Sequence, residues 1–334
     1  MTTLVVQIPC LNEAESLPAV LGEIPRAVPG VDRVLVLVID DGSTDGTATI
    51  ALAHGADRVV RFPQNRGLAA AFSTGLEAAL EMGADVIVNT DGDGQYPADA
   101  IPALVRPVLE HRADIVIGDR RPGEVAHFSP LKRLLQRLGN AVVRRASGTA
   151  VSDAASGFRA FSRRAALRLN IVSDYTYTME TLLQASAKNL PIASVPITAR
   201  RVDRPSRLFR SIPEYLMRVG MGILRIFTMY RPLPVFLRLG AVFLAAATLI
   251  GLRFFWYWLH GHGGGKVQSL IFAAILTVIG VFTLLLALVA DLISTNRRLL
   301  EEILLRQRRA DLAGDRGWSG ADRGADGRPP VEIR

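Results

Sequence analysis

The sequence predicts an α/β protein with a mostly parallel sheet between helices, followed by two membrane-spanning helices. Strand-like and helix-like segments alternate from residue 3 to 118, which is typical of a parallel sheet covered by helices on both faces. Near the C-terminus, the stretch 269–290 contains no charged residue and is longer than the roughly 18 residues that mark a membrane span. We therefore expect a sheet domain and a membrane hairpin.

The elements of the sheet domain follow one another at short intervals. Short apolar runs predict buried strands at TLVVQIP, RVLVLVI, DRVVRF, DVIVNT and ADIVIGDR. Helices are expected at EAESLPAVLGEI, at about 44–54 and at 68–82. Two later segments, SPLKRLLQRLGNAVVRRAS and SIPEYLMRVGMGILRIFTMY, have an apolar stripe at helical spacing with basic residues beside it. Such amphipathic helices either lie in the membrane interface or pack on the sheet domain.

Two apolar segments, at about 236–259 and 268–291, predict the hairpin. The first contains Arg253, but the aromatic run 254–258 beside it is typical of a membrane interface, which the arginine can reach. Arginines flank the pair on both outer sides, so the positive-inside rule places both flanks, and the working domain with them, in the cytoplasm. We expect an integral protein of the bacterial inner membrane or an equivalent one. A hairpin buried in a large soluble core is the alternative.

The chain divides into four expected regions. Residues 1–210 form the cytosolic domain, including an amphipathic helix at about 129–147, and 211–233 form a juxtamembrane amphipathic helix. Residues 234–295 hold the two spans. Residues 296–334 are expected to form a basic helix and a disordered tail, because the end is rich in Gly, Asp and Arg. A fragment ending near Tyr230 is expected to fold, since the alternating segments close a sheet without the hairpin.

Charge and cysteine content narrow the class of partner. The formal net charge is +8, and the basic excess lies at 128–147 and 200–231, close to the spans. Anionic lipid is therefore a better partner than nucleic acid. No signal peptide is recognisable at the N-terminus. The single cysteine, Cys10, excludes an internal disulfide and agrees with a reducing compartment.

The segment NTDGDGQYPADA, residues 89–100, places two carboxylates one residue apart just beyond a predicted strand. Ligands of open α/β sheets bind at the carboxyl ends of the strands, so Asp91 and Asp93 would border a site. Two hard oxygen donors suit Mg²⁺ or Mn²⁺, especially when phosphates supply further ligands. A surface turn is the alternative, because Asp and Gly form turns. Two other predicted strands also end in Asp or Asn, and this series favours a site.

The motifs PCLNEAESLP, DDGSTDGT, NRGLAAAFSTGLEAALEMGADVIVNTDGDGQYP, SGFRAF and YTMETLLQA make the chain resemble a family 2 glycosyltransferase. It most resembles the dolichyl- or polyprenyl-phosphate mannosyl/glucosyltransferase branch, over roughly residues 3 to 230. The resemblance implies a GT-A-type nucleotide-sugar-binding fold. It also implies metal-dependent, inverting transfer of a hexosyl group from a nucleotide-diphospho-sugar to polyprenyl (dolichyl or undecaprenyl) phosphate at the cytosolic membrane face.

The resemblance assigns the donor site residue by residue. Asp91 and Asp93 match the metal-binding Asp-x-Asp motif, with Gln95 as an additional ligand of Mg²⁺ or Mn²⁺. The nucleoside would be held by the residues at the ends of the first strands and by a glycine that lets backbone come close: Pro9, Asn12, Glu13, Asp40, Asp41 and Gly67.

The acceptor site follows from the chemistry of a phosphate nucleophile. A phosphate monoester is ionised at pH 7 and can attack the anomeric carbon without a general base, so Glu180 either orients sugar hydroxyls or caps a helix. Cations must position the phosphate; candidates for this site are Arg120, Lys132, Arg133, Arg201, Ser206 and Arg207. The arginines can also be simple contacts to lipid head groups. The family pattern Arg-x-x-Gly-x-Ser-Lys reads RVDRPSR here, so the family's acceptor geometry does not carry over directly.

Other classes of protein fit less well. A nucleotidyltransferase usually carries a Gly-x-Gly-x-Arg loop after the first strand, and a processive polysaccharide synthase carries Gln-x-x-Arg-Trp and more spans; neither pattern is present. Two alternatives remain: a family 2 transferase acting on another membrane lipid or cell-envelope glycan, and a membrane scaffold with a degenerate transferase domain. The retained Asp91, Asp93 and Gln95 argue against the scaffold.

Overall fold

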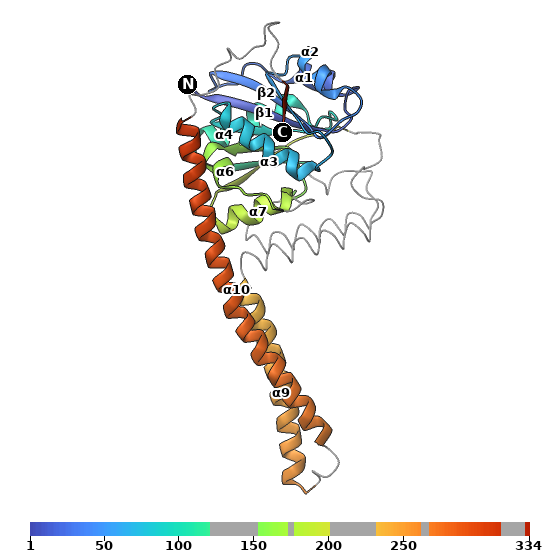
Figure 1. Ribbon diagram of the computed structural model, residues 1–334, viewed down its shortest axis with the longest axis vertical. Coiled ribbons are helices and arrows are strands. Elements are labelled where there is room, and N and C mark those ends of the chain that lie inside the picture. Colours follow the sequence, from blue (N-terminus) through green and yellow to red (C-terminus); the bar gives the residue numbers. More distant parts are fainter. Residues whose placement is uncertain (121–152, 173–176, 201–231, 262–266, 315–330) are drawn as a thin grey trace. The chain divides into compact units, whose positions relative to one another are not determined.

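The computed structural model describes residues 1–120, 153–172, 177–200, 232–261, 267–314 and 331–334 (Figure 1). The chain divides into two compact units. The first, which we call the sheet unit, comprises Met1–Ile223 together with Leu304–Arg334. The second, the hairpin unit, comprises Leu224–Ile303.

The sheet unit is built on eight strands in the order β7-β5-β6-β4-β1-β2-β3-β8. Strand β6 runs antiparallel to both of its neighbours, β4 and β5, and the other described pairs are parallel. The mostly parallel sheet predicted from the sequence is thereby confirmed. The strands are β1 (Thr3–Cys10), β2 (Arg33–Asp40), β3 (Arg58–Arg61), β4 (Val86–Asn89), β5 (Ile115–Asp119), β6 (Arg159–Ser162), β7 (Ile192–Pro196) and β8 (Val331–Ile333).

Helices cover both faces of this sheet, because alternate residues of the buried strands point to opposite faces. Val5 belongs to the apolar cluster under α3, α6 and α7, whereas Leu4 and Val6 belong to the cluster under α1, α2 and α4. The helices of the sheet unit are α1 (Leu17–Glu23), α2 (Thr47–Ala53), α3 (Leu68–Glu81), the 3₁₀ turn η1 (Ala98–Ala100), α4 (Ile101–Leu109), α6 (Arg163–Arg168) and α7 (Tyr177–Ala187).

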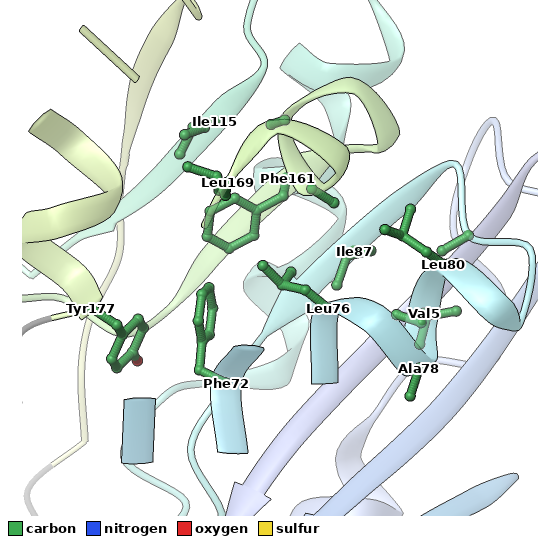
Figure 2. Close-up of a cluster of buried hydrophobic side chains, with 14 of the residues drawn as sticks. Val5, Phe72, Leu76, Ala78, Leu80, Ile87, Ile115, Phe161, Leu169 and Tyr177 are labelled. Atoms are coloured by element: carbon green, nitrogen blue, oxygen red, sulfur yellow. The ribbon is translucent and has the colours of Figure 1, made fainter. Parts of the chain in front are cut away.

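Aromatic packing joins α3 to β6 and α7 (Figure 2). The ring of Phe72 stacks on Tyr177 with centroids 4.3 Å apart and meets Phe161 edge-on at 5.6 Å. Phe72 and Phe161 are fully buried, and Tyr177 is 3% exposed. Such aromatic pairs add about 0.5–1.5 kcal/mol beyond their buried area. The first turn of α7 is therefore held firmly against the body of the sheet unit.

The C-terminal part of the chain differs from the sequence-based expectation. Helix α10 (Val267–Gly314) continues without a break past the end of the predicted span, and its residues from Leu304 onward belong to the sheet unit. Leu305 is 7% exposed in the same apolar cluster as α3. Arg308 donates to Leu169 O at 3.1 Å and to Glu77 Oε1 at 3.1 Å. The sheet unit thus includes residues that the fragment ending near Tyr230 would lack.

Residues 315–330 of the expected disordered tail lie outside the described residues, and the end of the chain beyond them forms a strand. Val331–Ile333 forms β8, which pairs in parallel with β3. Arg58, 8% exposed, makes ion pairs with both Glu81 and Glu332. The edge of β3 offers main-chain partners to Val331–Ile333, and the buried guanidinium of Arg58 offers a charge to Glu332.

The hairpin unit contains α9 (Pro232–Leu259) and most of α10, which run side by side (Figure 1). By length and composition, both helices are apolar enough to cross a membrane, and the predicted spans lie within them. A Cβ at Gly240 would lie 2.8 Å from the Leu284 side chain and 3.2 Å from Gly280 O. Small residues at such a crossing let two helices pack closely without a driving force from water.

Candidate active site

Polar residues gather at the carboxyl edge of the sheet. In the parallel pair β1 and β2, Cys10 is level with Asp40, and in β1 and β4, Gln7 is level with Asn89. The loops that follow these three strands therefore leave the sheet at the same edge. This is the edge at which open α/β sheets bind ligands.

The loop after β1 is fixed to the loop after β2. Asn12, which has a φ of 53°, donates its backbone N–H to Ser43 Oγ at 2.8 Å, and its Oδ1 accepts from Thr44 N at 2.9 Å. The backbone N–H of Glu13 donates to Thr47 Oγ1 at 3.1 Å. Asn12 and Glu13, both predicted to hold the nucleoside, thus order the two loops around the predicted site. Pro9 lies in β1, level with Ile39 of β2.

Asp41 organises the approach to α3. Its two oxygens accept from the backbone N–H groups of Arg66 at 2.7 Å and Gly67 at 3.0 Å. Burial raises the pKa of Asp41, and these hydrogen bonds partly offset the rise. Gly67 has a φ of +92°, a conformation that strongly favours glycine, and it directly precedes α3. The structure thus brings together two of the predicted nucleoside-binding residues, Asp41 and Gly67.

Asp40 has a buried oxygen that lacks a donor. Its side chain is 1% exposed, and Oδ1 accepts from Ser43 N at 2.8 Å. Among the described residues, none donates a hydrogen bond to Oδ2, although Arg61 Nε lies 3.3 Å away in an ion pair. A buried acceptor without a donor costs about 1–3 kcal/mol. A ligand N–H or O–H would remove this cost.

Asp91 and Asp93 lie on the loop directly after β4, and both are partly exposed. Asp93 Oδ1 accepts from Gln95 N at 3.0 Å. A Cβ at Gly157 would lie 3.3 Å from Asp91 Oδ1 and 3.6 Å from Oδ2, so the Asp91 carboxylate faces a stretch of backbone without a side chain.

Asp91 and Asp93 could hold a divalent cation only if a bound ligand supplied further coordinating atoms. No group of three or more His, Cys, Asp or Glu that could hold a metal occurs in the part of the chain that the structure describes. Mg²⁺ typically binds one or two carboxylates and takes its other ligands from substrate phosphates and water. Asp91 and Asp93 match that requirement, provided that a phosphate-containing ligand and water supply the rest.

The wall opposite Asp91 is the segment that leads into β6. Gly157 donates its N–H to Tyr96 Oη at 3.1 Å, and its carbonyl accepts from Asn89 Nδ2 at 2.9 Å. Arg159 is fully buried and donates to Ser156 O at 2.8 Å and to Thr178 O at 2.6 Å. Burial lowers its pKa to about 10. The buried arginine therefore ties this wall to the start of α7.

Gly157 and Arg159 lie in the motif SGFRAF, and neither was predicted from the sequence to be a site residue. The glycine was a usable signal, because a residue without a side chain inside a polar motif indicates a close approach of backbone to another group. Burial raises the pKa of Tyr96 to about 12, with the Asp91 charge adding to the rise, so this phenol stays protonated beside the carboxylate.

Two predicted catalytic residues have internal partners. Arg120, the first residue after β5, makes an ion pair with the buried Asp153 at 2.7 Å. Glu180, fully buried in the first turn of α7, accepts from Val172 N at 3.1 Å and from Gln184 Nε2 at 3.1 Å. The other acceptor-site candidates lie outside the described residues, as do both amphipathic helices: Lys132, Arg133, Arg201, Ser206 and Arg207.

Comparison with known proteins agrees with this geometry. The family described as Glycosyl transferase family 2 matches residues 5–169. The undecaprenyl-phosphate mannosyltransferase of Micrococcus luteus is 32% identical over 201 residues, which cover 57% of this chain and 81% of the relative. The polyprenol monophosphomannose synthase of Mycolicibacterium smegmatis is 32% identical over 207 residues, covering 59% and 76%.

Solved structures share the fold of the sheet unit. Glucosyl-3-phosphoglycerate synthase from Mycobacterium tuberculosis, crystallised with Mn²⁺, UDP and glucosyl-3-phosphoglycerate, matches with a TM-score of 0.52 and 26% identity. The match covers 68% of this chain and 79% of that one. Another structure of the same protein contains Mg²⁺ and UDP. The predicted GT-A-type fold is confirmed by these neighbours.

Proposed function

The chain belongs to glycosyltransferase family 2, and from this premise we propose that it glycosylates polyprenyl phosphate at the cytosolic face of a membrane. The donor is a nucleotide-diphospho-sugar, a divalent cation is required, and the hexosyl group is transferred with inversion. The names of the two relatives, an undecaprenyl-phosphate mannosyltransferase and a polyprenol monophosphomannose synthase, support this acceptor.

The donor half of the proposal is supported by Asp40 and the loop of Asp91 and Asp93, which follow β2 and β4 at the same edge of the sheet. At the end of β2, Asp40 has a buried oxygen to which no described residue donates a hydrogen bond, and a nucleoside N–H or ribose hydroxyl would supply one. Asp91 and Asp93 at the end of β4 would hold Mg²⁺ or Mn²⁺ against the diphosphate. When bound, the cation neutralises charge on the departing nucleoside diphosphate.

The acceptor needs no base from the protein. Its phosphate is already ionised, so a phosphate oxygen attacks the anomeric carbon while the bond from that carbon to the donor diphosphate breaks on the opposite face. Attack from the opposite face inverts the anomeric centre. Glu180 is engaged with Val172 N and Gln184, which supports a structural role for this carboxylate rather than proton removal.

The hairpin unit accounts for access to a lipid. Its two apolar helices are long enough to span a bilayer, and arginines follow the second span at Arg297 and Arg298. The positive-inside rule then places the sheet unit in the cytoplasm, where nucleotide-sugars occur. Anchoring at the surface raises the effective concentration of the lipid phosphate at the site.

The test is a donor panel. Membranes containing the protein are incubated with polyprenyl phosphate and, one at a time, labelled nucleotide-sugars, and the lipid is extracted. We expect label in the lipid with at least one donor, only when Mg²⁺ or Mn²⁺ is present, and about 10²-fold less label with Asp93→Asn. Label appearing only in water-soluble or polymeric glycan would contradict the proposed acceptor.

A further inference from the structure

The only acceptor-site arginine within the described residues is held by a buried carboxylate. Asp153 is fully buried and receives three hydrogen bonds from Arg120. They come from Nε at 2.7 Å, from Nη2 at 3.0 Å and from the backbone N–H at 3.3 Å. Such a two-point contact fixes the plane of the guanidinium as well as its charge. Asp153 therefore determines both where Arg120 lies and how it is turned.

This contact uses only one edge of the guanidinium. Arginine has five N–H donors, and Asp153 takes the edge formed by Nε and Nη2. Within the described residues, Nη1 makes no hydrogen bond, and the Arg120 side chain is 20% exposed. The end of the guanidinium, formed by Nη1 and the second hydrogen of Nη2, has the fork geometry that binds two oxygens of a phosphate.

Arg120 also stands at the correct edge of the sheet. It directly follows β5, and both β5 and β4 pair antiparallel with β6, so the ends of β5 and β4 point the same way. The negative charge of Asp91 acts on Arg120. Burial lowers the pKa of Arg120, but the hydrogen bonds that Arg120 donates to Asp153 and the nearby negative charges together outweigh that effect, so its pKa is raised overall. The guanidinium stays charged next to the loop of Asp91.

We propose that Asp153 is a positioning residue for the acceptor: it holds Arg120 by one edge so that the other edge binds the phosphate of the polyprenyl phosphate. This inference rests on the proposed function, because it names the residue that prepares the acceptor end of the same site. Asp153 itself touches neither substrate. It acts only by positioning the guanidinium of Arg120.

The test compares Asp153→Asn, Arg120→Lys and the double variant in full-length protein. Asp153→Asn removes the charge and one acceptor, and Arg120→Lys keeps the charge but removes the fork. Charge-assisted hydrogen bonds are worth enough to expect a rise of about tenfold in KM for polyprenyl phosphate from either change. KM for the nucleotide-sugar should change by less than about twofold. In the Arg120→Lys variant, Asp153→Asn should cause almost no further rise in KM for polyprenyl phosphate, because lysine has no guanidinium fork to position.

Asp114→Asn is the matched control. Asp114 is another buried carboxylate, 8% exposed, bonded to Ser162 Oγ at 2.6 Å, but it lies before β5, at the opposite end of that strand. We expect this change to lower the melting temperature without an effect specific to the acceptor. If Asp153→Asn raises both KM values equally, or still costs about tenfold in the Arg120→Lys background, the inference is wrong.

Direct binding of a short, water-soluble prenyl phosphate separates this inference from the proposed function. Wild-type protein that makes no labelled lipid with any donor would refute the proposed function. Binding of the prenyl phosphate reports on Asp153 in either case. Affinity weakened about tenfold in Asp153→Asn supports the inference, and unchanged affinity contradicts it.

Discussion

Asp91 and Asp93 are the residues whose chemistry is tested most simply. Both are partly exposed on the loop after β4, so replacing either by asparagine should leave the fold intact. The change removes a charged ligand, and we expect turnover to fall by about 10²-fold or more. The measurement is turnover against Mn²⁺ concentration, with the melting temperature as the control for folding. A well-folded Asp93→Asn variant with near-normal turnover would contradict the metal assignment.

Cys10 gives a residue-scale prediction that is independent of catalysis. Burial raises the pKa of this thiol well above its usual value, and the charges of Glu13, Asp40 and Asp91 add to the rise. The folded pKa thus exceeds the unfolded value of about 8.5, so the stability that the protonated thiol contributes is complete below that pH and declines as pH rises above it.

A thiol reagent at pH 8 should therefore leave the folded protein unlabelled and modify one thiol after denaturation. Replacing Cys10 with alanine should make the free energy of unfolding decline less as pH rises above about 8.5. Rapid labelling of the folded protein at pH 8 would show that the thiol is neither buried nor raised in pKa.

Some residues of the candidate site could be predicted from the sequence, and others could not, for a physical reason. Asp40, Asp91 and Asp93 follow apolar runs directly, so the strand pattern alone predicts their place at the edge of the sheet. Asp153 and Arg159 act through partners that are distant in sequence or are backbone carbonyls. The spacing of residues along the sequence does not predict such contacts, because they form only when β5 and β6 pair.

At the scale of elements, the last turns of α10 are the main departure from expectation. The basic helix expected from residue 296 is present as far as Gly314, as a direct continuation of the helix that contains the second span. The segment LLEEILLRQRR contains no Gly or Pro and consists of strong helix formers, so the helix continues. A fall in hydropathy ends a membrane span; it does not by itself end a helix.

Leu305 should matter to the stability of the sheet unit although it lies in a helix, α10, most of which belongs to the hairpin unit. It is 7% exposed within the core cluster, so Leu305→Ala should cost about 2–4 kcal/mol in the free energy of unfolding. Leu304→Ala is the control, since Leu304 is 37% exposed on the same turn. Denaturant unfolding in detergent should separate the two variants; equal midpoints would contradict the docking of α10.

At the scale of the whole molecule, the fold class and the hairpin follow from the sequence, but the extent of the sheet unit does not. A chain ending near Tyr230 lacks Leu305, Arg308 and β8, all of which contact the sheet unit. We expect this fragment to melt at a lower temperature than full-length protein. Joining residues 304–334 to it through a flexible linker should restore much of the difference, whereas a fragment as stable as the full chain would show that these contacts contribute nothing.

The central claim is that the nucleophile is the phosphate of a polyprenyl phosphate. It is tested most directly by giving purified full-length protein, in liposomes with Mn²⁺ and its labelled donor, either polyprenyl phosphate or the corresponding polyprenol, which lacks the phosphate. The account predicts a hexosyl-phosphate lipid, seen by mass spectrometry as the acceptor plus one hexose, from the first acceptor and no product from the second. Equal glycosylation of the polyprenol would contradict it, because a hydroxyl acceptor requires a base and the phosphate would then be dispensable.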